Sequence, residues 1–493
     1  MALAPSVRIG GARLVGPLLS VAVAACVALA FQVAPLAAVG LAGALCVFAC
    51  ALRWPDLAIY AVVFLLYSNL PAVSTLHGVP MALAALFPGL LLVPLARDVL
   101  VRREALVVRP TALLLLVLLV VQALGAGLSR DPPTSFGAVV TFAVEGVALY
   151  LLVTNALRTR ETLRGAAWAL VGAGVLMSVV PIFQQVTGTF DRDYGGLAQV
   201  DGGQGFETEG DEGPRQARLA GPIGETNRYA QVMLVLFPLA LERAFRARSR
   251  VLRLIALASA GSIALGFALA FSRGGAVGML CLLVAMVCLR VVEVRKLVYV
   301  GAGLALVLAL LPQYWARIGT LGASAQAMEA DGGGSTADGA VRRRLTEMLA
   351  AVRVFLDHPL IGVGPGLFKE YSVAYGKEDA LRRIESGRRA HSLYLEFAAE
   401  NGVLGLSLFL GAIACTLSEL AAARRALLAR GGDAELVGQT TACLLALVAY
   451  LSTGVFLHLS YMRYFYFVLA LGGAVAHVAA RAAAGPAPAG ARA

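Results

Sequence analysis

The stretch RRAHSLYLEFAAENGVLGL, residues 388–406, places an imidazole at the start of a long apolar segment. Arg388 and Arg389 precede His391, and Glu396 and Glu400 interrupt the apolar run that follows. Ionisable side chains are costly at membrane depth, so each one there is a candidate functional residue. A neutral imidazole can act as a general base, and nearby arginines keep it neutral by disfavouring its protonation. The stretch therefore predicts that His391 abstracts a proton at a cation-rich membrane surface.

Helical geometry predicts which neighbours share a face with this histidine. If the segment is helical from its first residue, successive side chains turn by about 100°. This rotation groups His391 with the following residues: Tyr394, Leu395, Ala398 and Gly402. Glu400 then points to another face, and we expect it to have a structural role, pairing with an arginine inside the bundle.

Arginines also flank other apolar segments. Arg218 and Arg228 lie in RLAGPIGETNRYAQ (218–231), and Arg273 lies in AFSRGGAVG (270–278). Arginine binds phosphate groups in a bidentate manner and stays charged at any working pH. If these arginines and His391 meet at one membrane surface, they predict a site for an anion carried on a lipid, such as a diphosphate.

The elements that must position these residues are membrane helices. The chain has 493 residues, of which 59% are hydrophobic and only 14% are charged, whereas soluble domains are nearer a quarter charged. A run of about 20 apolar residues crosses a bilayer, and 111–129 and 297–312 are examples of such runs. The net charge of +11 would suggest nucleic acid on a soluble chain. On a membrane protein it indicates cytoplasmic loops, anionic lipid and an anionic substrate, with no nucleic-acid partner.

Hydrophobic run length predicts an all-α polytopic integral membrane protein with about fourteen (12–14) transmembrane helices. The predicted spans lie near 14–31, 34–52, 55–72, 80–96, 111–128, 136–157, 166–187, 224–241, 254–270, 274–291, 297–312, 392–414, 436–457 and 461–480. The pair 55–72 and 80–96 has an alternative, in which the sequence between them forms a re-entrant turn.

Basic residues set the expected orientation. Lys and Arg gather in alternate connections, among them 97–109, 158–164, 243–253 and 424–430, which predicts that these face the cytoplasm. The expected organisation is N-terminal helices 1–187, a first periplasmic loop 188–223, central helices 224–312, a large periplasmic loop 313–391, C-terminal helices 392–480 and a cytoplasmic tail 481–493.

The sequence gives no indication of a metal, a cofactor or a disulfide. All seven cysteines fall inside apolar runs, where they are typical small hydrophobic residues. The acidic residues of 191–212 match no calcium-binding pattern, and GVGPG lacks the glycine spacing of a dinucleotide-binding loop.

Four segments occur in an order that resembles a known family. They are RLAGPIGETNRYAQ (218–231), AFSRGGAVG (270–278), DHPLIGVGPGLF (357–368) and HSLYLEFAAENGVLGL (391–406). Together they resemble the O-antigen ligase and O-antigen polymerase superfamily over residues 215–410. The last segment fits that family's pattern H-(N/S)-x-x-L-x-x-x-x-E-x-G through His391, Ser392, Leu395, Glu400 and Gly402. One departure is Met348, where the family usually has Trp after an arginine.

The resemblance implies a GT-C-like membrane glycosyltransferase with a long helical periplasmic loop before the twelfth span. It implies transfer of a glycan from undecaprenyl diphosphate to an acceptor sugar hydroxyl, without a metal and with inversion. The reaction takes place on the periplasmic side of the bacterial inner membrane. On this resemblance His391 is the base, Arg218 and Arg273 bind the diphosphate, and Glu400 and Gly402 orient the site. The possible further substrate contacts are Arg228, Arg343, Arg344, Arg388, Arg389 and Tyr394.

Several alternatives stay open at this stage. A ligase would use lipid A–core as acceptor, whereas a polymerase would use a lipid-linked repeat unit, and the same residues serve both. A flippase or transporter would require paired charges in matching places of two halves, and Glu145 is the only deep acid before the C-terminal half. Each candidate also has a structural alternative: His391 as a helix-start residue, Arg273 as an interfacial anchor and Arg228 as a partner of Glu225.

Overall fold

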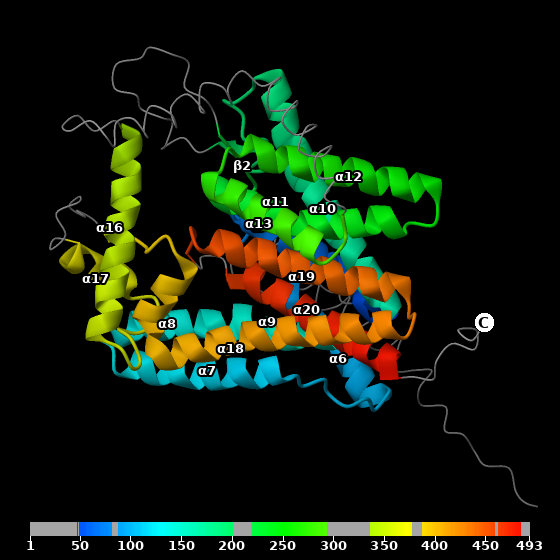
Figure 1. Cartoon of the computed structure of the whole chain (residues 1–493), viewed down its shortest axis with the longest axis horizontal. Coiled ribbons are helices and arrows are strands. Elements are labelled where there is room, and N and C mark those ends of the chain that lie inside the picture. Colours follow the sequence, from blue (N-terminus) through cyan, green and yellow to red (C-terminus); the bar gives the residue numbers. More distant parts are fainter. Residues whose placement is uncertain are drawn as a thin grey trace, which may run out of the picture.

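The computed structural model describes residues 47, 49–80, 87–200, 218–292, 336–376, 387–458 and 462–484, with the side chains of 87 and 336–343 left aside. These ranges are mainly helical, and the long helices run side by side (Figure 1). A short antiparallel pair of strands, β1 (Gln199–Val200) and β2 (Leu219–Gly221), is the one sheet in these ranges.

Seven helical segments in the described ranges are long and apolar enough to cross a membrane. One of them is built from α8 (Pro132–Phe142), the π-helical segment η3 (Ala143–Ala148) and α9 (Leu149–Ala156). The others are α7 (Pro110–Gly127), α10 (Arg160–Thr187), α12 (Arg250–Leu269), α18 (Leu393–Ala429), α19 (Ala434–Gly454) and α20 (Met462–Ala484).

Other helices complete the bundle. The pair α3 (Pro55–Tyr67) and α4 (Leu70–Leu76) is bent by 60° and counts as an eighth span if it is taken as one. Helix α13 (Arg273–Cys288) is apolar but short, and α11 (Thr226–Arg246) carries several charges along an almost fully buried surface. The elements outside the apolar bundle are α16 (Thr336–Asp357) and α17 (Phe368–Tyr375).

The helices of the structure agree with only some of the expected spans. The expected spans 14–31 and 297–312, and nearly all of 34–52, lie outside the described residues. The described part of the expected span 80–96 is not one helix, because prolines and a glycine interrupt it. It forms a 3₁₀ segment η1 (Phe87–Leu91), a short α6 (Leu92–Ala96) and a π-helical η2 (Arg97–Val101).

Local sequence explains where the long helices begin and end. Thr159 and Thr162 form a reciprocal capping box at the start of α10, and Gly188 ends it in the left-handed conformation. The side chain of Ser392 caps α18 by accepting the backbone N–H of Leu395. Because Ser392 is the cap, the helix begins after His391 rather than at it.

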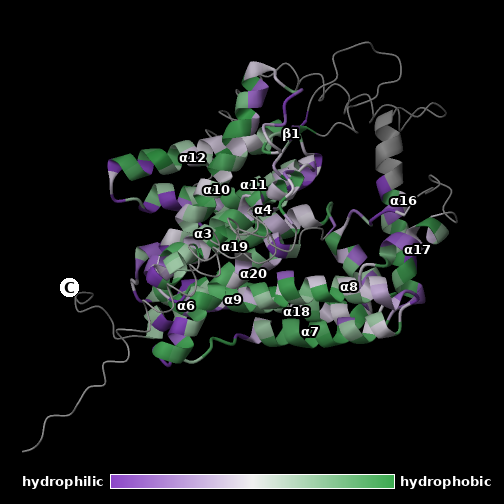
Figure 2. Ribbon diagram, turned by 180° about the vertical axis from the view of Figure 1, so that it is seen from behind, coloured by the Kyte–Doolittle hydropathy of each residue, from purple (hydrophilic) through white to green (hydrophobic). Residues whose placement is uncertain are grey.

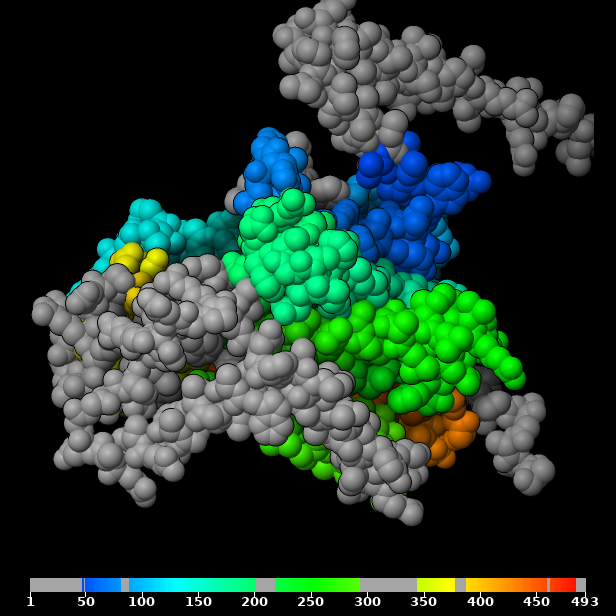
Figure 3. Space-filling model, turned by 90° about the horizontal axis from the view of Figure 1, so that it is seen from above, coloured from blue at the N-terminus to red at the C-terminus, as the bar shows by residue number. Residues whose placement is uncertain are grey.

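Burial divides the bundle into a centre and a periphery. The most apolar windows of α19 and α20 are 78% and 72% buried, whereas those of α12 and α18 are 33% buried. Exposed leucines and valines cover the outer faces, as on α7 and α12, and hydrophilic residues gather toward the ends of the bundle (Figure 2). Seen from above, α10 and α12 lie side by side on this outer surface (Figure 3). This distribution fits a bundle that is surrounded by lipid.

The basic connections meet at one end of the bundle, as expected from their alternation. Arg160 pairs with Asp433, and Arg164 and Arg243 share Glu435. Further ion pairs join Arg109 to Glu419 and Arg158 to Glu104. Helices α16 and α17 lie at the opposite end (Figure 1). The two ends of the molecule therefore differ in their composition and in their structure.

Candidate functional site

Helix α18 is interrupted near its start by a segment that packs across it. Gly402 has φ 62° and ψ −169°, which is not helical. Four backbone hydrogen bonds join the two segments: Val363 N to Ala399 O (3.0 Å), Gly364 N to Glu400 O (3.0 Å), Val403 N to Pro359 O (2.7 Å) and Leu404 N to Leu360 O (3.2 Å). The segment 359–364 thus satisfies backbone groups that the helix break leaves open.

Two glycines allow this close approach. A Cβ on Gly402 would lie 2.3 Å from the backbone of Leu360, and a Cβ on Gly362 would lie 2.3 Å from the backbone of Glu400. Both residues have positive φ, which only glycine adopts without strain. The two motifs DHPLIGVGPGLF and E-x-G therefore form opposite sides of one junction, which we call the glycine junction (residues 359–364 and 399–404).

The glycine junction corrects two expectations from helical geometry. His391 precedes α18 with φ 48°, and Gly402 breaks the helix, so the two residues do not share a helical face with Tyr394 and Ala398. Glu400 forms no ion pair with an arginine within the described residues. Its carboxylate accepts the backbone N–H of Phe368 at 3.3 Å instead. Its structural role is therefore to hold the start of α17.

His391 contacts a buried carboxylate. Its Nε2 lies 3.4 Å from Oε2 of Glu347, whose side chain is fully buried, while the imidazole is 31% exposed. The guanidinium of Arg388 lies 4.0 Å from the other oxygen of Glu347. Helix α16 therefore brings a carboxylate, and the chain before α18 brings the imidazole and a cation.

A second histidine lies next to the first. The rings of His391 and His458 are 5.7 Å apart between centroids. Burial, followed by the positive charges of Arg228 and Arg389, lowers the pKa of His458 to about 2. The backbone carbonyl of His458 accepts a hydrogen bond from Arg228. His458 is therefore neutral at any physiological pH and is held by a buried arginine.

Two of the predicted arginines, Arg218 and Arg228, are linked to these histidines through neighbouring residues. Arg218 donates to Oδ1 of Asn227 (3.4 Å) and to the carbonyl of Ala270 (3.3 Å). Ser272 donates to the same Asn227 oxygen at 2.8 Å, immediately before Arg273 at the start of α13. Asn227 and Arg228 are adjacent in α11, so the contacts continue from Arg218 to His458 and His391.

The guanidinium groups of Arg273 and Arg228 differ in the contacts that they make within the protein. Arg273 is partly buried and makes no ion pair or hydrogen bond with any residue that the structure describes. Arg228 is 1% exposed; it donates to Gln231 and lies 4.0 Å from Glu225. Within the described residues, the guanidinium of Arg228 thus contacts polar groups of the protein, whereas that of Arg273 makes no such contact.

The remaining candidates are placed as follows. Arg389 pairs with Glu396 at 3.4 Å, and the phenol of Tyr394 donates to the carbonyl of Leu451 at 2.9 Å. Arg344 lies partly buried on α16, and the side chain of Arg343 is outside the described residues. Of these residues, Arg389 faces a cavity.

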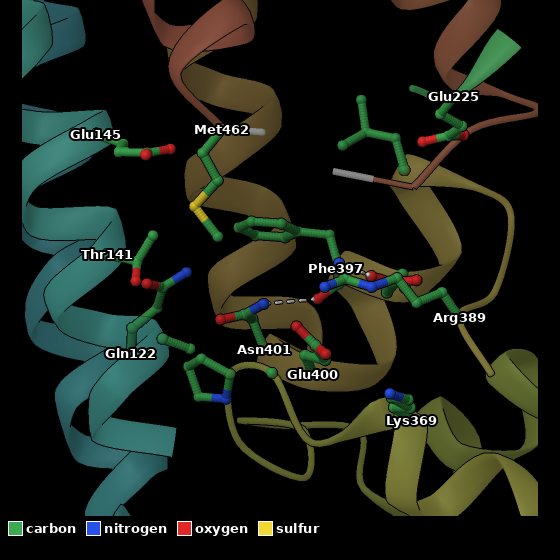
Figure 4. A pocket seen from close by; sticks show the side chains of 15 residues that line it. Gln122, Thr141, Glu145, Glu225, Lys369, Arg389, Phe397, Glu400, Asn401 and Met462 are labelled. Carbon is green, nitrogen blue, oxygen red and sulfur yellow. Dashed lines mark hydrogen bonds and ion pairs between the residues drawn. The ribbon is translucent and has the colours of Figure 1, made fainter. Parts of the chain in front are cut away.

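This cavity is lined by Arg389 and Leu393, which lie two residues before and after His391 in the chain, and has a volume of about 490 Å³. Its lining comes mainly from α7, α8, η3, α17, α18, α20 and the segment around Pro365 (Figure 4). Glu400, Asn401 and Phe397 project into it from α18, and Gln122 and Thr141 face them from α7 and α8 (Figure 4).

Several site residues were missed by reading the sequence. Glu347 is one acid in an arginine-rich stretch, and His458 and Asn227 stand in no recognised pattern. A deep polar residue such as Gln122, in the middle of TALLLLVLLVVQALGAG, does carry a signal, because amides are rare in apolar spans. That signal identifies a residue but not its partners.

Comparison with known proteins adds one finding. The family model described as O-antigen ligase matches residues 232–410, which include α11, α13, α16, His391 and both sides of the glycine junction. No curated protein matches the chain. Residues 232–410 of the chain are therefore similar to the O-antigen ligase family.

Proposed function

We propose that the protein is a membrane glycosyltransferase that moves a glycan from undecaprenyl diphosphate to a hydroxyl group of an acceptor sugar. The observation that supports this proposal is the contiguous group running from Arg218 through Asn227, Arg228 and His458 to His391. This group combines cations suited to a diphosphate with an imidazole suited to deprotonating an alcohol.

The proposed reaction is a single displacement. The acceptor oxygen bonds to the anomeric carbon while the bond from that carbon to the diphosphate oxygen breaks, which inverts the configuration. The leaving diphosphate gains negative charge, which Arg218 and Arg273 stabilise. A well-placed donor of this kind contributes about 2.7–4 kcal/mol to transition-state stabilisation. No metal or cofactor takes part in the proposal.

The contact with Glu347 supports one tautomer of His391 in this proposal. Because Nε2 faces the carboxylate at 3.4 Å, it carries the proton of the neutral ring. Nδ1 is then the nitrogen that accepts the proton of the acceptor hydroxyl in this proposal. Glu347 stabilises the imidazolium that results, and it acts as a positioning residue.

The other candidates receive supporting roles in this proposal. Arg228 fixes the backbone at His458, and Glu400 and Gly402 hold the glycine junction against α17. Arg388 and Arg389 lie at the edge of the site, where each contacts a glutamate but keeps part of its side chain exposed toward a second anionic group. Arg344, the side chain of Arg343 and Tyr394 stay possible substrate contacts.

The proposed location is the bacterial inner membrane, with a GT-C-like arrangement of helices. Cytoplasmic loops of membrane proteins carry an excess of Lys and Arg. The ion-paired basic end of the bundle then faces the cytoplasm, and the opposite end, with His391, faces the periplasm. The preferred acceptor is lipid A–core, which makes the protein a ligase; the alternative is a polymerase that uses a lipid-linked repeat unit.

A transfer assay with the purified protein, the lipid-linked donor and the acceptor tests the proposal. We expect His391→Ala to abolish product while the protein stays folded and inserted. The matched control is His477→Ala, since His477 lies on α20 toward the basic end. Wild-type product formation by His391→Ala would reject the assignment of the base.

A further inference from the structure

The cavity beside His391 offers many hydrogen-bond acceptors and few free donors. Its two cations are Lys369 and Arg389, and Arg389 already pairs with Glu396. The acceptors in its lining belong to carboxylates and amides, namely Glu145, Glu225, Glu396, Glu400, Gln122 and Asn401. A ligand that fits this lining must supply hydrogen-bond donors without bringing negative charge.

Two of these acceptors are buried without a partner. Gln122 is 4% exposed and Asn401 is 2% exposed. The side-chain oxygens Oε1 of Gln122 and Oδ1 of Asn401 accept no hydrogen bond from the part of the chain that the structure describes. A buried polar group left in this state destabilises the protein unless a ligand or water binds to it. Both side chains reach the cavity from opposite walls, α7 and α18 (Figure 4).

An aromatic ring lies between the polar groups. Phe397 stacks on Phe409 behind it, with 4.3 Å between the ring centroids. Its ring lies between Met462 and Asn401 in the cavity (Figure 4). An apolar surface next to amides and carboxylates suits a molecule with C–H groups on one face and hydroxyl groups around its rim.

We propose that this cavity is a subsite for an uncharged sugar ring, with Gln122 and Asn401 accepting hydroxyl hydrogen bonds and Phe397 packing against the ring. The inference rests on the proposed function and adds the class of sugar. Its volume of about 490 Å³ lies within the range of about 300–1,000 Å³ typical of small-molecule sites. The diphosphate belongs at Arg218 and Arg273, and phosphorylated or uronic sugars are disfavoured by the carboxylates of the cavity.

The sugar has two sources, the donor or the acceptor, and binding experiments separate them. The acceptor probes are methyl glycosides of glucose, galactose and N-acetylglucosamine, compared with methyl glucuronide as the anionic case. The donor probes are citronellyl diphosphate and the same lipid carrying N-acetylglucosamine. Binding is measured to the full-length protein in neutral-lipid nanodiscs by saturation-transfer NMR and by competition.

The test variant is Gln122→Leu, and the matched control is Gln439→Leu. Gln439 is also buried, with both of its side-chain polar atoms lacking partners in the described part of the chain, but it lies on α19 outside the cavity. We expect Gln122→Leu to weaken sugar binding about tenfold. We expect its melting temperature to stay level or rise, because an unpaired oxygen is removed. Gln439→Leu should bind as the wild type does.

The outcome pattern identifies the source. If the acceptor sugar binds in the cavity, Gln122→Leu loses methyl glycoside binding. If the donor sugar binds there, Gln122→Leu loses the extra affinity that the wild type shows for citronellyl diphosphate carrying N-acetylglucosamine over citronellyl diphosphate alone. Should Gln122→Leu fail to fold, Thr141→Val is used in its place.

The subsite is overturned if Gln122→Leu binds every probe as the wild type does, or if methyl glucuronide binds better than the neutral glycosides. It is also overturned if the wild type binds none of the methyl glycosides and binds citronellyl diphosphate equally well with and without the attached sugar. Failure of the proposed function is a separate result, in which the wild type binds no citronellyl diphosphate and makes no product.

Discussion

Nε2 of His391 lies 3.4 Å from Oε2 of Glu347, a side chain with no exposed surface. The two residues come from different elements, since Glu347 lies on α16 and His391 precedes α18. A buried carboxylate fixes both the tautomer and the direction of an imidazole, and it stabilises the cation formed after proton transfer.

Glu347→Gln should therefore lower kcat while leaving KM for both substrates nearly unchanged. A glutamine amide can donate to Nε2 and so favour the wrong tautomer, and losses of this kind are on the order of 10²–10⁴ in rate. Steady-state kinetics of the purified enzyme measures the split between kcat and KM. Glu370→Gln, at an exposed position of α17, is the control. A variant with wild-type kcat would remove Glu347 from the mechanism.

Arg218→Lys and Arg273→Lys should each reduce kcat/KM for the donor by more than about tenfold. Lysine keeps the charge but cannot make the bidentate phosphate contact of a guanidinium. For Arg218 the change also removes the donors to Asn227 and to the Ala270 carbonyl. Arg253→Lys, at the basic end, should have no effect on turnover. Full turnover in both test variants would place the diphosphate site elsewhere.

Gly402→Ala should destabilise the protein by about 1–3 kcal/mol. The new Cβ would lie 2.3 Å from the Leu360 backbone, at a residue with φ 62°. Thermal unfolding in detergent measures the change. Gly261→Ala provides the comparison, because its added Cβ meets no atom within 4 Å on α12 and favours the helix. Equal melting temperatures for the two variants would contradict the tight packing of the glycine junction.

Acid should destabilise the protein through His458. The pKa of this residue is about 2 in the folded protein, mainly because of burial, and its ordinary value is 6.5. The unfolded chain therefore binds a proton that the folded protein rejects, so stability is lost as the pH falls below 6.5, by up to about 1.4 kcal/mol per pH unit. His458→Gln should show a smaller fall in melting temperature between pH 7.5 and pH 5 than the wild type. The control His77→Gln, at an exposed position, should lose as much melting temperature between pH 7.5 and pH 5 as the wild type. An equal loss in His458→Gln would contradict the prediction.

Part of this architecture follows from the sequence alone. The length of the apolar runs predicts the membrane helices. The alternation of basic and non-basic loops predicts that the loops around Arg109, Arg164 and Arg243 lie at the same end of the bundle, because lipid imposes both rules directly. The order of the motifs predicts the similarity to the O-antigen ligase family, whose model matches residues 232–410. The helical face assigned to His391 was wrong, since a side-chain period cannot show that Ser392 caps the helix or that Gly402 breaks it.

Long-range partners lie beyond this kind of reasoning. The contact between His391 and Glu347, and the approach of Gln122 to Asn401, depend on how α16 and α7 pack against α18. Local propensity carries no information on such packing. A lone polar residue in an apolar span, such as Gln122, is the strongest hint that the sequence offers.

The glycine junction connects the two parts of α18 across the break at Gly402. Two of its hydrogen bonds attach before the break and two after it, so segment 359–364 bridges the interruption of the helix. The junction lies between α16, which carries Glu347, and the first turns of α18, which follow His391. The imidazole of His391 and the carboxylate of Glu347 are therefore carried by two elements that this junction connects. Their relative position is already set before a substrate binds.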